Sequence, residues 1–310
     1  MSLVVGVDGG QSTLRLSAGG AIADGPGFSY HDGDPVSVTL GSVRAAWTRL
    51  GHGGPVERVV LGLTGLPSTV ELRDALAAGV ARLMSAGEVV LCADNVTAHA
   101  GALPDGYGVA LTGGTGVNCL AVDAAAAVVH RVDGWGHLYG DDGSAFAIGR
   151  AGIAAVLRAV DGRGAPTALS ALAVARFGPV EGLPLRLYTS RRVVDDTARF
   201  APDVVGAAGD GDEVAAAIVS RAGRELARTA TAAVAVLPGT GPVPVAHVGR
   251  LMPEGGPLVG AYRDALARQC PRARGVPAAG SALDGALRLA ATPALMAAYG
   301  SHIHVYRGFS

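Results

Sequence analysis

The sequence predicts an α/β protein with a duplicated fold and a cleft between its two halves. Through the first hundred residues, segments with the spacing of strands alternate with segments that have the spacing of helices. A glycine-rich turn lies between two strand-like segments near the start, at residues 9–12, and again at residues 113–116. Because each strand–glycine–strand unit opens an α/β segment, we interpret the two as copies of one architecture.

The first half carries the alternation most clearly. An apolar run that ends at Asp8 predicts a buried strand, and Asp34-Pro35 is a typical helix start. Strands are expected at residues 3–8, 13–18, 57–64 and 88–92, and helices at residues 35–50, 68–84 and 95–103. The boundary between the two domains is expected near residues 104–107.

The second half is expected to be richer in helices. Strands are predicted at residues 107–112, 117–122 and 243–248, and helices at residues 143–160, 166–177, 212–236 and 257–269. Ser281 is a candidate cap for a helix that runs to about residue 291, and Pro293 opens one or two further turns.

The composition fits two globular domains and removes several classes of protein. The 310 residues are 49% hydrophobic and 16% charged, and the formal net charge is −1. With neither sign dominant, we expect no nucleic-acid partner. All 25 basic residues are arginine. The absence of lysine excludes a Walker-type phosphate-binding loop, a protein-kinase lysine and a Schiff-base lysine.

Cysteine usage and the hydrophobic pattern predict a reduced, cytoplasmic protein. The three cysteines are Cys92, Cys119 and Cys270, which form no CxxC pair. The N-terminal residues lack the basic segment of a signal peptide. The long uncharged stretch of residues 229–249 contains three prolines, which argues against a membrane span.

The first glycine-rich turn combines an acid, small residues and hydroxyls. Residues 8–13 read Asp-Gly-Gly-Gln-Ser-Thr. Glycines let backbone amides approach a phosphate closely, and a carboxylate beside them suits hydrated Mg²⁺. The alternative is an ordinary hairpin turn. Residues 112–118, Thr-Gly-Gly-Thr-Gly-Val-Asn, repeat this chemistry, so that two such turns predict a phosphate clamp built from main-chain donors.

Two further segments carry chemistry. Asp94 directly follows a predicted strand, where a carboxylate points into the crevice of an α/β domain, although Asp also suits a helix N-cap. Residues 132–145 combine glycines, Trp135, Tyr139 and paired acids, a set that can stack on a sugar and bind its hydroxyls. The alternative for this loop is a long turn in which Asp142 or Ser144 caps the next helix.

In this order and spacing, these segments resemble the N-acetylglucosamine kinase group of the superfamily that contains sugar kinases, actin and heat-shock ATPases. The matching segments are residues 8–12, 62–65, 94, 112–118, 134–137 and 140–145, followed by residues 211–212, 222–223, 248–249 and 281–286. The resemblance covers nearly the whole chain. Its most specific part is the run from Gly134-Trp135-Gly136-His137 through Gly140–Ala145.

The resemblance implies two ribonuclease-H-like domains of the actin-type ATPase class with a central cleft. The first would contain residues 1–106 and be completed by a C-terminal helix at about residues 283–300, and the second would contain residues 107–282. It further implies a homodimer that uses ATP and Mg²⁺ to phosphorylate the 6-hydroxyl of an amino sugar, with N-acetylglucosamine as first choice.

The resemblance also implies roles for individual residues. Asp94 would be the general base, and Asp8 would lie beside the metal. ATP would be bound by Gly9, Gly10, Gln11, Ser12, Thr13, Gly113, Gly114, Thr115, Gly116, Ala208 and Gly249. The sugar would be bound by His31, Thr64, Asp94, Asn118, Gly134, Trp135, Gly136 and Asp141.

Two departures from the family pattern bear on the choice of sugar and of function. Gln11 stands where many members have a third glycine, and His31 stands where the sugar-contacting asparagine is expected. Asp32 and Asp34 follow His31, and a carboxylate there would select an ammonium group, which would make the chain a glucosamine kinase. The alternative, which we favour, is that both acids face solvent in the turn before the helix that begins at Pro35. The chain could also be an ATPase that activates a radical dehydratase through an iron–sulfur cluster, or a sugar-sensing regulator without catalysis. The His302/His304 pair is expected to lie in a solvated tail rather than to bind metal.

Overall fold

The computed structural model describes residues 3–11, 13–27, 33–52 and 54–308. The chain divides into two compact units, one of residues 1–110, 120–130 and 277–310, and one of residues 111–119 and 131–276. The division passes through the strands β6 (Tyr107–Gly113), β7 (Val117–Asp123) and β8 (Val128–Asp133). The predicted boundary at residues 106–107 lies at the start of β6.

The first unit is built on a mixed six-stranded sheet in the order β11-β5-β4-β1-β2-β3. The strands are β1 (Leu3–Gly9), β2 (Thr13–Ala18), β3 (Ala21–Pro26), β4 (Val56–Leu63), β5 (Ala86–Ala93) and β11 (Ile303–Arg307). The central strand β4 is parallel to both β1 and β5, whereas β2, β3 and β11 pair antiparallel. The predicted β1, β2, β4 and β5 are confirmed; β3 and β11 were not predicted.

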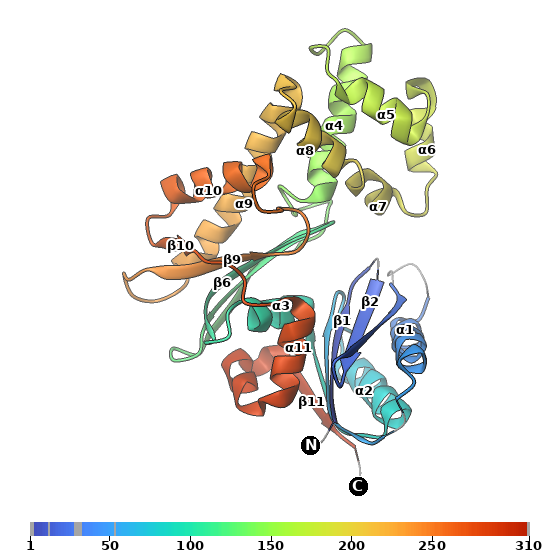
Figure 1. Ribbon diagram of the computed structural model, residues 1–310, viewed down its shortest axis with the longest axis vertical. Helices are drawn as coiled ribbons and strands as arrows, with labels where there is room; N and C mark the ends of the chain where they lie inside the picture. The colour runs from blue at the N-terminus through green and yellow to red at the C-terminus, as the bar shows by residue number, and fades with distance from the viewer. Residues whose placement is uncertain (1–2, 12, 28–32, 53, 309–310) are drawn as a thin grey trace. The chain divides into compact units, whose positions relative to one another are not determined.

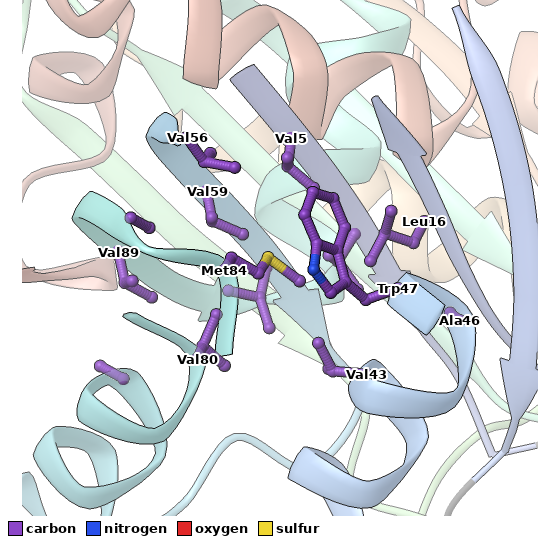
Figure 2. Close-up of a cluster of buried hydrophobic side chains, with 14 of the residues drawn as sticks. Val5, Leu16, Val43, Ala46, Trp47, Val56, Val59, Val80, Met84 and Val89 are labelled. Atoms are coloured by element: carbon purple, nitrogen blue, oxygen red, sulfur yellow. The ribbon is translucent and has the colours of Figure 1, made fainter. Parts of the chain in front are cut away.

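Both faces of this sheet are covered by helices. The helices α1 (Pro35–Leu50) and α2 (Val70–Met84) cover one face, and α3 (Asp94–Ala102) and α11 (Ala282–Ala291) cover the other (Figure 1). Alternate residues of β4 enter different cores: Val59 and Leu61 pack with Trp47 and Met84, whereas Val60 packs with Val96. Figure 2 shows the first of these clusters. Burial on both faces explains why β4 and β5 are almost continuously apolar.

The helix ends follow the signals in the sequence. Asp34 caps α1 by accepting a hydrogen bond from the Ser37 amide at 2.8 Å, and proline fills the first helical position. Ser281 and Asp284 form a reciprocal capping box on α11. Pro293 then begins the 3-10 segment η2 (Pro293–His302), so the predicted helix at about residues 283–300 is two elements.

The C-terminal segment is a strand, which corrects the expectation of a solvated tail. β11 pairs antiparallel with β5, with Ile303 opposite Cys92. The His304 ring lies 2.9 Å from a carboxylate oxygen of Asp74 on α2. Neither contact is visible as a local pattern, because both depend on elements more than two hundred residues away.

The second unit combines strands with most of the helices. The strand order of its sheet is β10-β9-β6-β7-β8, with β9 at Val243–Val248 and β10 at Ala273–Gly275. Its helices are α4 (Ala145–Val160), α5 (Leu169–Phe177), α6 (Leu183–Tyr188), α7 (Val193–Ala198), α8 (Ala201–Gly209), α9 (Glu213–Ala235) and α10 (Pro257–Gln269), with the short 3-10 turn η1 (Val180–Gly182). The predicted α4, α5, α9 and α10 are confirmed. Within the described ranges, no helix has the length and apolar character needed to cross a membrane.

Candidate active site

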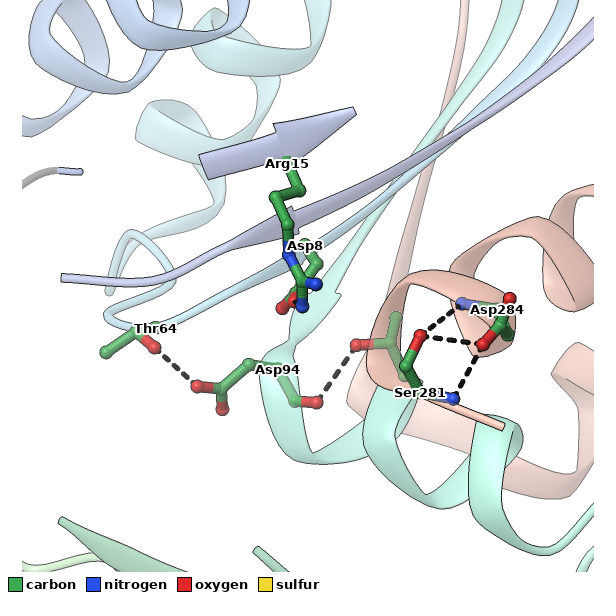
Figure 3. A network of polar contacts seen from close by, with 7 residues as sticks. Asp8, Arg15, Thr64, Asp94, Ser281 and Asp284 are labelled. Atoms are coloured by element: carbon green, nitrogen blue, oxygen red, sulfur yellow. Dashed lines mark hydrogen bonds and ion pairs between the residues drawn. The ribbon is translucent and has the colours of Figure 1, made fainter. Parts of the chain in front are cut away.

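Three polar side chains lie where the parallel strands of the first unit end. Asp8 pairs with Gly62 in the β1–β4 register, and Leu63 pairs with Ala93 in the β4–β5 register. Thr64 and Asp94 are therefore the residues that directly follow two neighbouring strands. Figure 3 shows Asp8, Thr64 and Asp94 beside one another at this edge of the sheet.

Asp94 is held by hydrogen bonds at both its side chain and its backbone. The Thr64 hydroxyl donates to the carboxylate, and the Thr97 hydroxyl donates to the Asp94 carbonyl at 2.9 Å. Burial raises the pKa of Asp94, and the nearby Asp8 charge raises it further, while the Thr64 hydrogen bond opposes both effects. The N-cap of α3 is Ala93, so the alternative role of Asp94 as a helix cap is not supported.

Arg15 is a component of this corner that the sequence did not reveal. It stands opposite Asp8 in the β1–β2 register, and its guanidinium nitrogen lies 2.8 Å from an Asp8 carboxylate oxygen. The Asp8 side chain is 19% exposed and that of Arg15 is 47% exposed. Only the hairpin register reveals this pair, because seven residues separate the two in sequence.

The first glycine-rich turn is a tight connection between β1 and β2. The Gly10 amide donates to the Thr13 carbonyl at 3.0 Å, and Gly9 is the last residue of β1. Gln11 is exposed in the turn, and Thr13 begins β2. Ser12 lies outside the described residues. Among the hydroxyls predicted to meet phosphate here, Thr13 is the one the structure places.

The second glycine-rich turn is joined to the start of α4. The Gly114 amide donates to the Gly116 carbonyl at 2.9 Å, and the Ala145 amide donates to the Gly114 carbonyl at 3.0 Å. A side chain at Gly114 would meet no atom within 4 Å, whereas one at Gly116 would lie 2.6 Å from a carboxylate oxygen of Asp141. The turn therefore presents backbone to open space at Gly114 and is closed at Gly116.

Two of the predicted ATP-binding glycines lie against each other. Gly249 follows β9 with a φ of 103°, and a Cβ there would lie 2.1 Å from the Gly113 carbonyl oxygen. The positive φ and the close approach both require glycine. Ala208 lies in the last turn of α8, where its carbonyl accepts from the Gly211 amide at 3.3 Å.

The aromatic loop between β8 and α4 is shaped by two aspartates with positive φ. Asp133 has a φ of 63° and Asp141 a φ of 58°. One Asp133 carboxylate oxygen accepts from the Gly134 amide at 2.8 Å and from the Asp141 amide at 3.0 Å. Residues other than glycine that adopt left-handed backbone angles concentrate at functional sites. The sequence places Asp133 in this loop but predicts no role for it.

Asp141 is only 8% exposed, and it accepts hydrogen bonds from the Val117 and Gly136 backbone. Burial raises its pKa, as does the charge of Asp133. Its carboxylate packs under Gly116, so it connects the aromatic loop to the glycine-rich turn. The alternative role for Ser144 is confirmed, because its hydroxyl caps α4 by accepting from the Ala147 amide at 3.2 Å.

Trp135 is 68% exposed, and the Arg131 guanidinium lies 5.0 Å from the centre of its ring. Asn118 packs against Gly134, and its side-chain oxygen is buried and finds no hydrogen-bond partner within the described part of the chain. A buried acceptor in a native protein normally has a hydrogen-bond donor, so the Asn118 oxygen lacks an expected partner. These residues together form a candidate sugar-binding surface.

The loop before α1, which is expected to select the sugar, lies only partly within the described residues. His31 and Asp32 lie outside the described residues. Asp34 is engaged as the α1 cap, and this hydrogen bonding lowers its pKa. A cavity of about 560 Å³ lies in the second unit between α4 and α9; Asp142 and Gly143, which follow Asp141, line it, but none of the residues predicted to bind ATP or sugar does.

Comparison with known proteins identifies the family. Residues 5–276 match the BadF/BadG/BcrA/BcrD ATPase family. The chain belongs to this family. One curated relative, an N-acetylmuramic acid/N-acetylglucosamine kinase of Clostridium acetobutylicum, is 32% identical over 153 residues, which are 49% of this chain and 50% of that protein. The chain thus spans about half the length of the curated relative it matches.

Solved structures support the fold of this member of the BadF/BadG/BcrA/BcrD ATPase family. A candidate N-acetylglucosamine kinase of Chromobacterium violaceum is 26% identical, with coverage of 93% of this chain and 99% of that one and a TM-score of 0.70. A hexokinase of Schistosoma mansoni complexed with glucose is 13% identical, with coverage of 94% and 85% and a TM-score of 0.58. The prediction of an α/β fold with two sheets, in the class of actin-type ATPases, is confirmed, while the central cleft stays a prediction.

Proposed function

We propose that this chain is an ATP-dependent kinase that phosphorylates the 6-hydroxyl of an amino sugar. Family membership supports ATP use, and the curated relative and the Chromobacterium violaceum protein are described as kinases of such sugars. The observation that carries the proposal is the Asp94 carboxylate at the end of β5, fixed by Thr64 and partly buried.

Asp94 has the properties of a general base. A carboxylate that accepts the proton of a sugar hydroxyl makes that oxygen a better nucleophile toward phosphorus. Burial and the Asp8 charge raise the pKa of Asp94, so it binds the incoming proton more strongly than an exposed carboxylate would. Transfer of a phosphoryl group otherwise requires positioning and charge neutralisation, which backbone amides and a metal provide.

The residues present fit a magnesium ion held mainly by the nucleotide. Mg²⁺ in phosphotransfer sites takes one or two carboxylates together with phosphates and water. Asp8 offers that carboxylate, although Arg15 engages one of its oxygens at 2.8 Å. Among the described residues no group of three or more acidic, histidine or cysteine side chains is arranged to hold a metal. When bound, the ion would neutralise charge on the phosphates.

The nucleotide phosphates have a candidate place at Gly114. Its neighbour Gly113 packs on Gly249, which fixes the backbone. A Cβ added at Gly114 would meet no atom within 4 Å, so there is room beside this residue for a phosphate. The same proposal includes the first turn at Gly10 and Thr13. From the same resemblance we also propose that the protein is a homodimer and is located in the cytoplasm.

N-acetylglucosamine is the first choice of sugar, and glucosamine is the alternative. The loop from Gly134 to Asp141 offers the exposed ring of Trp135, and Asn118 of β7, which packs against Gly134, has a side-chain oxygen without a donor; these groups suit a sugar ring and its donors. Asp34 serves as a helix cap, so Asp32 is the remaining acid that would select an ammonium group.

The activator of a radical dehydratase is less well supported by the cysteines. Cys92, Cys119 and Cys270 are all buried, and burial raises the pKa of the Cys92 and Cys119 thiols. An iron ligand must be a thiolate, which such surroundings disfavour. Stoichiometric iron in the purified protein would favour the activator.

Release of ADP with a panel of sugars tests the proposal. The panel contains N-acetylglucosamine, N-acetylmuramic acid, glucosamine and glucose, each with ATP and Mg²⁺. We expect phosphorylation of N-acetylglucosamine, followed by product analysis for a 6-phosphate. A strong preference for glucosamine that Asp32→Asn abolishes would replace the first choice by the alternative. Sugar binding without ADP release would indicate a regulator.

A further inference from the structure

Strand register brings Thr64 beside Asp94. In the parallel pair of β4 and β5, Leu63 is opposite Ala93, so the next residue of each strand leaves the sheet at the same level. Side chains that follow neighbouring parallel strands share one edge of the sheet. The register of β4 and β5 therefore places Thr64 next to Asp94.

Thr64 is fixed at two points. Its amide donates to the Gly9 carbonyl at 2.8 Å, and its hydroxyl donates to Oδ2 of Asp94. A hydroxyl has one proton to donate. Because Asp94 receives that proton, Thr64 has none left to offer to an oxygen of the sugar.

The Asp94 backbone is equally constrained. Thr97 donates to the Asp94 carbonyl at 2.9 Å, and its hydroxyl lies so close to Gly62 that a Cβ there would be 2.1 Å away. The first turn of α3 is thus seated directly on β4. Among the described residues, Thr64 is the side chain that donates to the Asp94 carboxylate, and it does so at Oδ2, so Oδ1 is the oxygen without a side-chain donor and the one we assign to receive the proton.

The geometry points to Thr64 as the positioning residue of the general base rather than as a sugar-binding residue. This inference rests on the proposed function. Thr64 holds Oδ2 of Asp94, sets the rotation of the carboxylate and directs Oδ1 toward the sugar hydroxyl. It acts through Asp94, so its loss affects the chemical step and leaves the binding of the sugar in place.

Two substitutions test this role by kinetics. Thr64→Val keeps the branched shape and removes the donor, so we expect kcat to fall roughly 10- to 100-fold, the range for a hydrogen bond to a charged group. The KM values for sugar and ATP should stay within about twofold. Thr64→Ser restores the hydroxyl and should recover most of kcat. A rise in the sugar KM with an unchanged kcat would overturn the inference, as would full activity of Thr64→Val.

The double variant with Asp94→Asn shows whether Thr64 acts through the carboxylate. If it does, Thr64→Val causes no further loss of kcat in the Asp94→Asn background. Equal losses in both backgrounds would contradict the inference. Thr231→Val is the matched control, because the Thr231 hydroxyl oxygen is buried without a partner among the described residues. That variant should keep wild-type kinetics.

Urea unfolding tests the inference even if the proposed function fails. The proteins compared are the wild type, Thr64→Val, Asp94→Asn and the variant that carries both substitutions. If the wild type phosphorylates no sugar, the kinase assignment is wrong. The hydrogen bond still predicts that the stability losses of Thr64→Val and Asp94→Asn are not additive. Additive losses would show that the two side chains do not act together, which overturns the positioning role on its own.

Discussion

The candidate functional region of the first unit and that of the second unit are each stabilised by different kinds of contact. In the first unit, the corner of Asp8, Thr64 and Asp94 is maintained by two side-chain contacts at the ends of paired strands, the hydrogen bond from Thr64 to Asp94 and the ion pair of Asp8 with Arg15. In the second unit, the glycine-rich turn and the aromatic loop are maintained by backbone hydrogen bonds, by backbone amides that donate to the Asp133 carboxylate, by positive φ angles, and by close contacts at Gly116 and Gly249 that leave no room for a side chain. The first arrangement suits proton transfer, and the second suits recognition of a phosphate by main-chain donors. Substitutions should therefore affect catalysis in one region and binding in the other.

The largest expected effect is that of Asp94→Asn. The amide keeps the shape of the carboxylate but cannot accept the proton, so kcat should fall about 100-fold or more while sugar binding survives. Steady-state kinetics and calorimetric titration of the sugar measure the two effects. Asp105→Asn, which changes an exposed acid in the loop before β6, serves as the control. A wild-type rate for Asp94→Asn would place the base elsewhere, and Asp141 is the next residue to test.

The second prediction concerns how the helix that carries Asp94 is anchored. His99 on α3 is fully buried, with Nδ1 3.0 Å from the Tyr299 hydroxyl and Nε2 3.2 Å from the Gly108 carbonyl. Since a carbonyl only accepts, Nε2 carries the proton of the neutral ring, and the Tyr299 hydroxyl donates to Nδ1. Burial lowers the pKa of His99 to about 4.

Because the unfolded chain binds a proton at His99 near pH 6.5 and the folded chain does so only near pH 4, stability falls as the pH drops through this window. We expect a loss of about 2 kcal/mol between pH 7 and pH 5 from this group. Urea unfolding at both values measures it. In His99→Gln the slope should be flatter; an equally steep slope would mean that another group titrates.

The third prediction concerns ATP and the backbone-built region. Gly114→Val places a branched side chain in open space where we propose that phosphate approaches, so the KM for ATP should rise roughly tenfold with little change in the sugar KM or in thermal stability. Gly116→Val is the informative contrast, because its side chain would collide with Asp141 and destabilise the fold. An unchanged ATP titration for Gly114→Val would mean that the loop is only a turn.

Local patterns in the sequence predicted the regular core of each region. The apolar runs of β4 and β5, the cap at Asp34 and the acid after β5 are all local signals, and the structure contains each of them. β3 was missed because Ala21–Pro26 contains Asp, Gly and Pro, which are poor strand formers, and its place depends on pairing with β2. β11 likewise depends on pairing with β5.

The parts of the site that the sequence did not reveal all depend on register or tertiary contact. The partner of Asp8 is Arg15 because the β1–β2 hairpin places them opposite each other. Asp133 accepts its two hydrogen bonds while its own backbone has a positive φ, a conformation that the residue types of this loop do not predict. Local chemistry thus supplied the candidate residues, and strand register determined which of them lie together.

The smallest expected effect is at the edge of the first region, in the loop before α1. If the acids of this loop select the sugar, removal of a carboxylate there should change the ratio of rates with glucosamine and N-acetylglucosamine. Asp34 already accepts the Ser37 amide at 2.8 Å as the cap of α1, and asparagine caps helices about as well as aspartate. We therefore expect Asp34→Asn to change the ratio less than about twofold and to leave the melting temperature nearly unchanged. Initial rates with both sugars, measured beside Asp32→Asn, check this. A reversal of preference in Asp34→Asn would show that this carboxylate binds the sugar as well as capping the helix. The loop before α1 would then be a third functional region, beside the corner of Asp8, Thr64 and Asp94 and the aromatic loop of the second unit.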